Sequence, residues 1–195
     1  AEDGEILCKG PNVMLGYYKD PALTKTVFDE EGWFHTGDIG IWEDNRFLKV
    51  TDRKKEIFKL SNGKFVAPQV IENIFKESVL IDQIMVVGAH EKYASALISP
   101  NFTNLQQWCE AENISCKDRR EMIHLPEVLK IFTEEVNKLN RALSDPEKIV
   151  KYRLISDEWS PNTGELSPTL KLRRKFIYDK YQTVLAEVYQ KKNAV

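Results

Sequence analysis

The residues best suited to chemistry lie in the stretch from Gly32 to Pro68. Gly37 permits a sharp turn that leaves Asp38 on it, and a carboxylate there can accept two hydrogen bonds from the vicinal diol of a ribose. Arg53 follows fifteen residues later and supplies a planar, always-charged donor fork that suits ribose oxygens or phosphate. Residues 41–50 are typical of a strand–turn–strand hairpin, which would bring Asp38 and Arg53 together on one ligand. An ordinary surface hairpin with an Asp–Arg ion pair explains the same spacing.

Four blocks of sequence, in order along the chain, resemble the AMP-forming acyl-CoA synthetases of the adenylate-forming superfamily. The blocks are YYKDPALT, GWFHTGDIG, DRKKEIFKLSNGKFVAPQVIE and LSPTLKLRRKFI. The resemblance is strongest to the long-chain fatty acid–CoA ligases and covers the chain from Gly4 to about Tyr181. In that family the Ser/Thr/Gly-rich phosphate-binding loop and the acyl pocket lie further upstream. The resemblance therefore implies the C-terminal part of a longer enzyme, lacking most of the N-terminal domain, and we expect this part alone to be inactive.

The resemblance implies an enzyme that activates a fatty acid with ATP to an acyl-adenylate and pyrophosphate, then transfers the acyl group to CoA. It assigns Asp38 and Arg53 to the ribose of the nucleotide. Lys171 matches the family's C-terminal lysine, whose ammonium would stabilise charge developing on the α-phosphate and the attacking carboxylate. Many members of the superfamily have Ser-Gly before this lysine, whereas this chain has Thr169-Leu170, as in the long-chain branch. Taken without the resemblance, Lys171 is a solvated lysine at the start of a helix.

Two further assignments follow from the resemblance. Lys55 matches the hinge about which the C-terminal domain turns between the two half-reactions, and a hinge needs only a few backbone dihedrals to change. Lys59, Gly63 and Lys64 match the loop that lines the CoA channel, where glycine allows close approach of the pantetheine arm. A basic loop exposed to solvent explains the same residues without any ligand.

The hydrophobic pattern indicates an α+β fold. We expect helices beginning at Pro68 and at Pro126, strands at 81–88 and 94–99, and a final helix over 171–191 with Phe176 facing inward. The resemblance divides these elements into a β-rich tail of the N-terminal domain, residues 1–53, and a mobile C-terminal lid domain, residues 54–195. The lid would be a small mixed β-sheet with packed helices. The tail would lack most of its packing partners and leave apolar faces open.

Composition sets further limits. The chain has 195 residues, 42% hydrophobic content and a net charge of −2, which favours a packed domain and gives no sign of a nucleic-acid partner. The three cysteines lack CxxC pairing, as suits a cytoplasmic protein. The acidic start AEDGEILCKG is unlike a signal peptide, and it lacks an initial Met, as we expect of a fragment. No apolar run approaches the ~20 residues that a membrane span needs. Peripheral contact with a membrane and the oligomeric state are left open.

The implied ligands are a fatty acid, ATP with Mg²⁺, and CoA. The three histidines are scattered without metal-ligand spacing, so we expect no metal site in this chain and place the Mg²⁺ ligands upstream. Two alternatives stay open. The acyl-adenylate can be loaded onto a carrier protein instead of CoA, or the chain can be a stand-alone module that binds anions through its lysine-rich loop, although its near-neutral charge disfavours the second.

Overall fold

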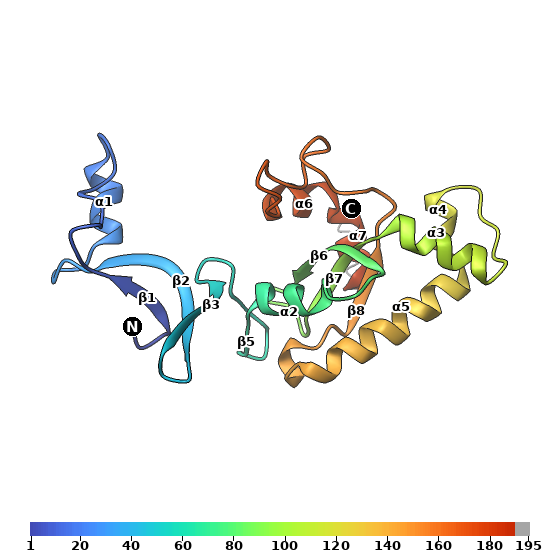
Figure 1. The fold of residues 1–195 in the computed structure, drawn as a ribbon, viewed down its shortest axis with the longest axis horizontal. Helices are drawn as coiled ribbons and strands as arrows, with labels where there is room; N and C mark the ends of the chain where they lie inside the picture. Colours follow the sequence, from blue (N-terminus) through green and yellow to red (C-terminus); the bar gives the residue numbers. More distant parts are fainter. Residues whose placement is uncertain (190–195) are drawn as a thin grey trace. The chain divides into compact units, whose positions relative to one another are not determined.

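The computed structural model describes residues 1–189 and divides the chain into two compact units, Ala1–Ile57 and a second unit that begins at Phe58 (Figure 1). The predicted domain boundary after Arg53 lies in the turn that precedes this division. Each unit has its own secondary structure, and the two are described separately below.

The first unit is a three-stranded antiparallel sheet with one short helix. Its strands pair in the order β1-β2-β3, and the elements are β1 (Glu5–Cys8), α1 (Pro21–Val27), β2 (Phe34–Glu43) and β3 (Phe47–Arg53). Residues 44–46 join β2 to β3, and two of them, Asp44 and Asn45, have positive φ, 51° and 53°. Two consecutive residues with positive φ form the tight turn that matches the twist of a hairpin. The predicted strand–turn–strand hairpin is thus confirmed.

The outer part of this hairpin carries apolar side chains that its own unit does not cover. Residues 41–50 are all exposed, and the large apolar side chains among them are Ile41, Trp42, Phe47, Leu48 and Val50. Clustered exposed side chains of this kind are unusual in a complete globular protein. The outer part of this hairpin therefore leaves apolar side chains open to solvent.

The second unit is built on a three-stranded sheet in the order β6-β7-β8, with β6 antiparallel and β8 parallel to β7. Its elements are β4 (Phe58–Lys59), β5 (Phe65–Val66), α2 (Pro68–Phe75), β6 (Ile81–Val87), β7 (Ser95–Pro100), α3 (Phe102–Ala111), α4 (Arg119–Met122), α5 (Pro126–Leu139), η1 (Asn140–Ala142), η2 (Asp145–Glu147), β8 (Lys151–Leu154), α6 (Arg174–Lys180) and α7 (Gln182–Val188). The predicted α+β class with a small mixed sheet is confirmed.

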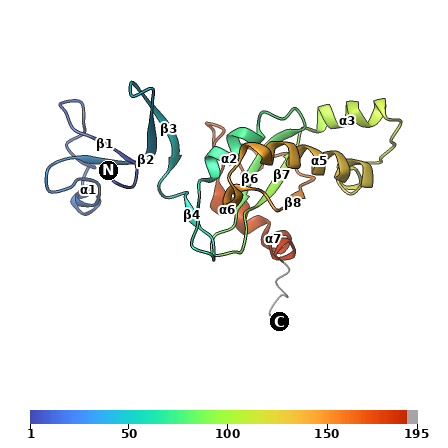
Figure 2. The same cartoon turned by 90° about the horizontal axis from the view of Figure 1, so that it is seen from below.

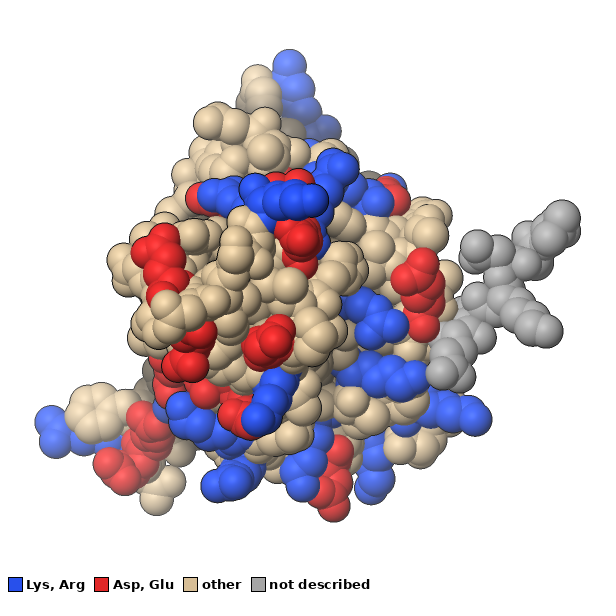
Figure 3. All heavy atoms as spheres, turned by 90° about the vertical axis from the view of Figure 1, so that its right-hand side faces the viewer, with Lys and Arg blue, Asp and Glu red and all other residues tan. Residues whose placement is uncertain are grey.

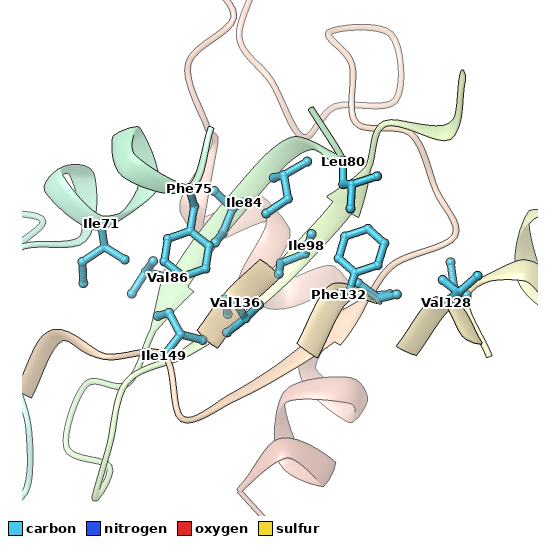
Figure 4. Packing of buried hydrophobic residues seen from close by; sticks show 14 of the residues in the cluster. Ile71, Phe75, Leu80, Ile84, Val86, Ile98, Val128, Phe132, Val136 and Ile149 are labelled. Atoms are coloured by element: carbon cyan, nitrogen blue, oxygen red, sulfur yellow. The ribbon is translucent and has the colours of Figure 1, made fainter. Parts of the chain in front are cut away.

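Alternation along the central strands separates two hydrophobic clusters. Ile84 and Val86 of β6 and Ile98 of β7 pack with α2 and α5, as Figure 4 shows. Met85 and Leu97 point to the opposite face and pack with α6 and α7. Successive side chains of a strand point to opposite faces of the sheet, so a strand whose sheet is covered on both faces has a nearly continuous apolar sequence. In Figure 2, α2 and α5 lie on one side of the sheet and α7 on the other.

The single helix predicted over 171–191 is wrong in its start and its continuity. Helix α6 begins only at Arg174, and the helical stretch breaks at Tyr181 before α7 continues it. The residues before Arg174 are held as a hairpin, because Ser167 N–H donates to the Lys171 carbonyl at 2.8 Å and Leu166 bridges Leu172. Lys191 lies outside the described residues.

Phe176 also differs from its predicted inward position. Its side chain is exposed, with the ring over the Arg173 guanidinium at 5.1 Å and against Gly164. Of the other apolar residues in this stretch, Ile177, Tyr181, Leu185 and Val188 are buried, and Val184 is partly buried. The helical period therefore predicts the buried face of these helices, but it also places Phe176 on that face, where the structure does not.

Candidate active site

Asp38 and Arg53 are direct partners across the hairpin of β2 and β3. Nε of Arg53 lies 3.4 Å from Oδ1 of Asp38, and the side chains are 58% and 35% exposed. An ion pair so open to water contributes only ~0–1 kcal/mol. Both groups therefore retain donor and acceptor capacity for a ligand with hydroxyl or phosphate oxygens.

The turn that presents Asp38 is held by a buried carboxylate that the sequence did not single out. Glu5 is only 4% exposed, and its Oε1 accepts a hydrogen bond from the N–H of Gly37 at 3.0 Å. Its Oε2 lies 2.9 Å from Nδ1 of His35 and 2.8 Å from Nζ of Lys54. Burial alone would raise the pKa of Glu5, but the hydrogen bonds from Lys54, His35 and Gly37 outweigh it and lower the pKa. The ionised carboxylate of Glu5 thus holds the backbone of the turn at Gly37.

Gly37 itself has φ of +74°, a conformation that favours glycine, and a Cβ built there would meet no atom within 4 Å. Thr36 stabilises the same turn, since its Oγ1 donates to the Ile6 carbonyl at 2.8 Å and accepts from the N–H of Asp38 at 3.1 Å. Hydrogen bonds to Glu5 and Thr36 therefore hold the backbone of the turn, while the side on which a Cβ of Gly37 would lie is open. This arrangement suits a residue that must present a carboxylate to a ligand.

Lys55 is exposed and lies in a turn between β3 and β4. The residues around it are held by the first unit, because Lys54 N–H donates to the Gly37 carbonyl at 2.8 Å and Glu56 N–H donates to the Arg53 carbonyl at 2.8 Å. Lys54 also pairs with Asp3 at 2.6 Å. The compact first unit ends at Ile57, two residues after Lys55.

The loop predicted to line the CoA channel is the tip of the hairpin of β4 and β5. Gly63 has φ of +86° and donates its N–H to the Leu60 carbonyl at 2.9 Å, while Leu60 N–H donates to the Lys64 carbonyl at 2.8 Å. The Lys59 ammonium lies over the ring of Phe65 at 5.5 Å, and that ring is 68% exposed. Lys59, Gly63 and Lys64 are thus brought together on one exposed, backbone-bonded loop.

Lys171 lies near the end of a surface hairpin formed by residues 165–173. Its N–H donates to Oγ of Ser167 at 3.1 Å, and its carbonyl accepts from the N–H of the same residue. Leu170 precedes it with φ of +60°, a conformation that an L-residue other than glycine adopts at a cost. Within residues 1–189 no hydrogen bond or ion pair holds the Lys171 ammonium, and the residue is exposed. The structure therefore fixes its backbone and leaves its charge available.

Two buried acidic side chains lie at the ends of this hairpin, Glu165 within it and Glu72 in contact with Arg174 just after it, and the sequence analysis assigned a role to neither. Glu72 of α2 forms a two-pronged ion pair with Arg174, at 2.8 and 2.7 Å. Glu165 is fully buried and lies 2.6 Å from Nζ of Lys180. Arg174 lies in the last of the four sequence blocks, and only the fold reveals its partner Glu72, which lies far away in the sequence.

The described residues give no sign of a metal site or a membrane span. Among residues 1–189, no three His, Cys, Asp or Glu side chains come together as metal ligands would. In the same part of the chain, no helix combines the length and the apolar character needed to cross a bilayer.

Comparison with known proteins identifies relatives over almost the whole chain. Residues 55–193 match the family described as AMP-binding enzyme C-terminal domain. Human long-chain-fatty-acid–CoA ligase 1 is 35% identical over 190 residues, which is 96% of this chain and 27% of that protein. The long-chain-fatty-acid–CoA ligase FadD15 of Mycobacterium tuberculosis is 33% identical over 192 residues, covering 98% of this chain and 32% of its own length. The chain thus spans between a quarter and a third of these relatives.

Solved structures agree with this assignment. The adenylation domain of a carboxylate reductase from Mycobacterium chelonae superposes with a TM-score of 0.77 at 26% identity, covering 96% of this chain and 28% of that one. The A-PCP didomain of the carboxylic acid reductase from Segniliparus rugosus, solved with AMP, gives a TM-score of 0.76 at 27% identity and covers 95% of this chain and 24% of its own.

Proposed function

Because the chain belongs to the family of AMP-binding enzyme C-terminal domains, we propose that it is the C-terminal part of an AMP-forming long-chain fatty acid–CoA ligase. The similarity to ligases of that name over more than nine tenths of the chain carries this proposal. The reaction joins a fatty acid to AMP with release of pyrophosphate, and a CoA thiol then displaces AMP from the acyl carbon. The substrates are a fatty acid, ATP and CoA.

In this proposal Asp38 and Arg53 bind the ribose of the nucleotide. The Asp38 carboxylate accepts hydrogen bonds from the ribose hydroxyls, and the exposed guanidinium of Arg53 donates to ribose or phosphate oxygens. Their 3.4 Å separation supports simultaneous contact with one sugar. Glu5 contributes indirectly, since it fixes the turn that carries Asp38.

Lys171 is the residue we propose for the adenylation step. Negative charge develops on the α-phosphate and the attacking carboxylate, and an ammonium placed beside those oxygens lowers the barrier. The exposed position of Lys171 and its freedom from ion pairs within the described chain support this role. Mg²⁺ would neutralise phosphate charge when ATP binds, but residues 1–189 contain no set of carboxylates suited to hold it, so no step is assigned to it.

Lys55 is proposed as the hinge position, and Lys59, Gly63 and Lys64 as the lining of the CoA channel. The tight glycine turn supports close approach of a narrow pantetheine arm, and the two lysines suit the phosphates of CoA. The three free cysteines support a cytoplasmic location.

Transfer of the acyl group to a carrier protein is a second candidate. The didomain structure that resembles this chain contains an adenylation domain joined to a PCP, which favours this acceptor. The higher sequence identity to CoA ligases favours CoA. A stand-alone anion-binding module is not favoured, because the net charge of the chain is −2. On the one face that Figure 3 shows, basic and acidic residues are interspersed.

The test compares the 195-residue chain with the complete ligase. With ATP, Mg²⁺ and palmitate, the chain alone should release no pyrophosphate, whereas the complete ligase should release it and form palmitoyl-CoA. Turnover by the 195-residue chain alone would refute the assignment to a C-terminal part. If the complete ligase acylates a phosphopantetheine carrier and not CoA, the second candidate replaces the first.

A further inference from the structure

The hairpin that carries Lys171 is closed at its base by backbone contacts. Arg173 N–H donates to the Glu165 carbonyl at 2.8 Å, and Leu166 forms a bridge with Leu172. A hairpin this short has little stability of its own, because an isolated two-stranded ribbon is marginal in water. Its position in the second unit therefore depends on its contacts with the rest of the unit, which are the packing of Leu166 and Leu172 in the second hydrophobic cluster and the ion pairs at its two ends.

The C-terminal end is held by Arg174, three residues after Lys171. Its guanidinium donates to both oxygens of Glu72, from NH1 to Oε1 at 2.8 Å and from NH2 to Oε2 at 2.7 Å. A two-pronged contact fixes direction as well as distance, which a single ammonium contact does not. The start of α6 is thereby tied to α2.

Glu72 also reaches the central sheet. Its Oε1 accepts the N–H of Val86 in β6 at 2.8 Å, and the residue is 4% exposed. Burial raises the pKa of Glu72, and Arg174 opposes that rise by stabilising the ionised form. Loss of Arg174 would leave the Glu72 carboxylate buried without the cation that stabilises it.

The N-terminal end is held by Glu165 through a second buried contact. The Lys180 ammonium lies 2.6 Å from Oε1 of Glu165 and 2.9 Å from Oδ2 of Asp157. Tyr181 donates its hydroxyl to the same Asp157 oxygen at 3.0 Å. Both ends of the hairpin are thus fixed by a buried carboxylate that pairs with a cation of α6.

Buried ion pairs are weak sources of stability, because desolvation consumes most of the attraction, but they can select one arrangement. We propose that Glu72 with Arg174, supported by Glu165 with Lys180, are positioning residues that hold the Lys171 hairpin in one place against the sheet. The catalytic consequence rests on the proposed role of Lys171 in adenylation. The fixing of the hairpin does not rest on it.

Hydrogen exchange of the 195-residue chain tests the positioning directly. Three variants break or weaken the pair: Glu72→Gln, Arg174→Met and Arg174→Lys. The matched control is Arg119→Met, which removes an exposed ion pair with Glu158 in the same unit. Amides of 166–173 should exchange about tenfold faster in Glu72→Gln and Arg174→Met, while amides of β6 and β7 stay within about twofold.

The Arg174→Lys variant should restore slow exchange in part, because it keeps the charge and loses the fork. The control should leave residues 166–173 unchanged. Unchanged exchange at 166–173 in Glu72→Gln and Arg174→Met would overturn the proposal. Equal acceleration throughout the second unit would also overturn it, since the pair would then serve the core and not the hairpin.

A second measurement separates this inference from the proposed function. In the complete ligase, Glu72→Gln should lower kcat of adenylation about tenfold without a matching rise in KM for ATP, and thioester formation from a supplied acyl-adenylate should hardly change. If Lys171→Ala leaves adenylation intact while the hairpin loosens as expected, the proposed function fails and the positioning stands. If Lys171→Ala abolishes adenylation and Glu72→Gln changes neither exchange nor rate, the positioning fails alone.

Discussion

Leu170 allows a sharp test of the hairpin geometry. It has φ of +60°, and its side chain is 63% exposed. The left-handed conformation costs a residue with a Cβ about 1–2 kcal/mol, whereas glycine adopts it freely. At an ordinary position glycine is instead less stable than alanine by roughly 0.5–1 kcal/mol, because the unfolded chain has more freedom. The sign of the glycine–alanine difference therefore reports the backbone conformation.

We predict that Leu170→Gly is more stable than Leu170→Ala by about 0.5–1 kcal/mol, the left-handed cost minus the entropy term. Both variants lose the same leucine side chain beyond Cβ, so its packing cancels in the comparison. For this unit the difference corresponds to a rise in Tm of roughly 2–4 °C. The same substitutions at Thr169, which is not among the residues with positive φ, should give the opposite order.

Urea denaturation followed by tryptophan fluorescence measures these differences. Trp159 is 2% exposed, donates to the Tyr181 hydroxyl at 3.2 Å and therefore reports the second unit. If Leu170→Ala proves as stable as Leu170→Gly or more so, the turn described before Lys171 is incorrect. A matching gain for glycine at Thr169 would show that the effect does not come from the left-handed residue.

The remaining predictions concern the buried charges and the ribose contacts. Glu5→Gln should lower the free energy of unfolding of the first unit by roughly 1.5–3 kcal/mol, because a carboxylate hydrogen-bonded to a charged partner becomes a neutral amide. Hydrogen exchange of the Gly37 amide measures this loss. Folding lowers the pKa of Glu5, so the stability that its carboxylate contributes is complete above the pKa of about 4.3 in the unfolded chain and is lost as the pH falls through the lowered pKa of the folded state. Hydrogen exchange of the Gly37 amide, followed as the pH is lowered, should show this loss in the wild type and not in Glu5→Gln. Lys180→Met should lower the free energy of unfolding of the second unit, measured by urea denaturation, by about 3 kcal/mol, because Glu165 is left buried without its cation. This is the low end for a broken buried pair, since about a third of the Lys180 side chain is exposed. A loss no larger than that of an exposed ion pair would contradict the prediction. In the complete ligase, Arg53→Ala should raise KM for ATP about tenfold and Arg53→Lys less, and an unchanged KM in both would argue against the ribose contact.

Much of the second unit follows from local patterns. The helices at Pro68 and Pro126 begin where the sequence indicates, since proline fits the first turn and the apolar stripes have helical period. The sequence also indicated that the hairpin brings Asp38 close to Arg53, but the exact register of that pair depends on an irregularity between Ile39 and Gly40, which the turn at Asp44 does not predict. The family resemblance stated from four sequence blocks is confirmed by the match over residues 55–193.

The missed residues share one property, which is that their partners are distant in sequence. Glu5 and Lys54 are separated by 49 positions, and Glu72 and Arg174 by 102. Periodicity describes which face of an element is buried, but it carries no information on which charge meets which across the fold. The hairpin before Arg174 was mistaken for helix for a related reason. Its tight turn uses a leucine with positive φ, where a glycine would have marked the break.

The central claim is that Lys171 acts in adenylation, and the two half-reactions of the complete ligase test it most directly. Lys171→Ala should slow formation of the acyl-adenylate from palmitate and ATP by about 100-fold or more, while CoA thioester formation from a supplied acyl-adenylate stays within about twofold. The control Lys175→Ala removes an exposed ammonium four residues further on and should change neither step. Equal losses in both half-reactions, or an unchanged rate of adenylation, would contradict the account.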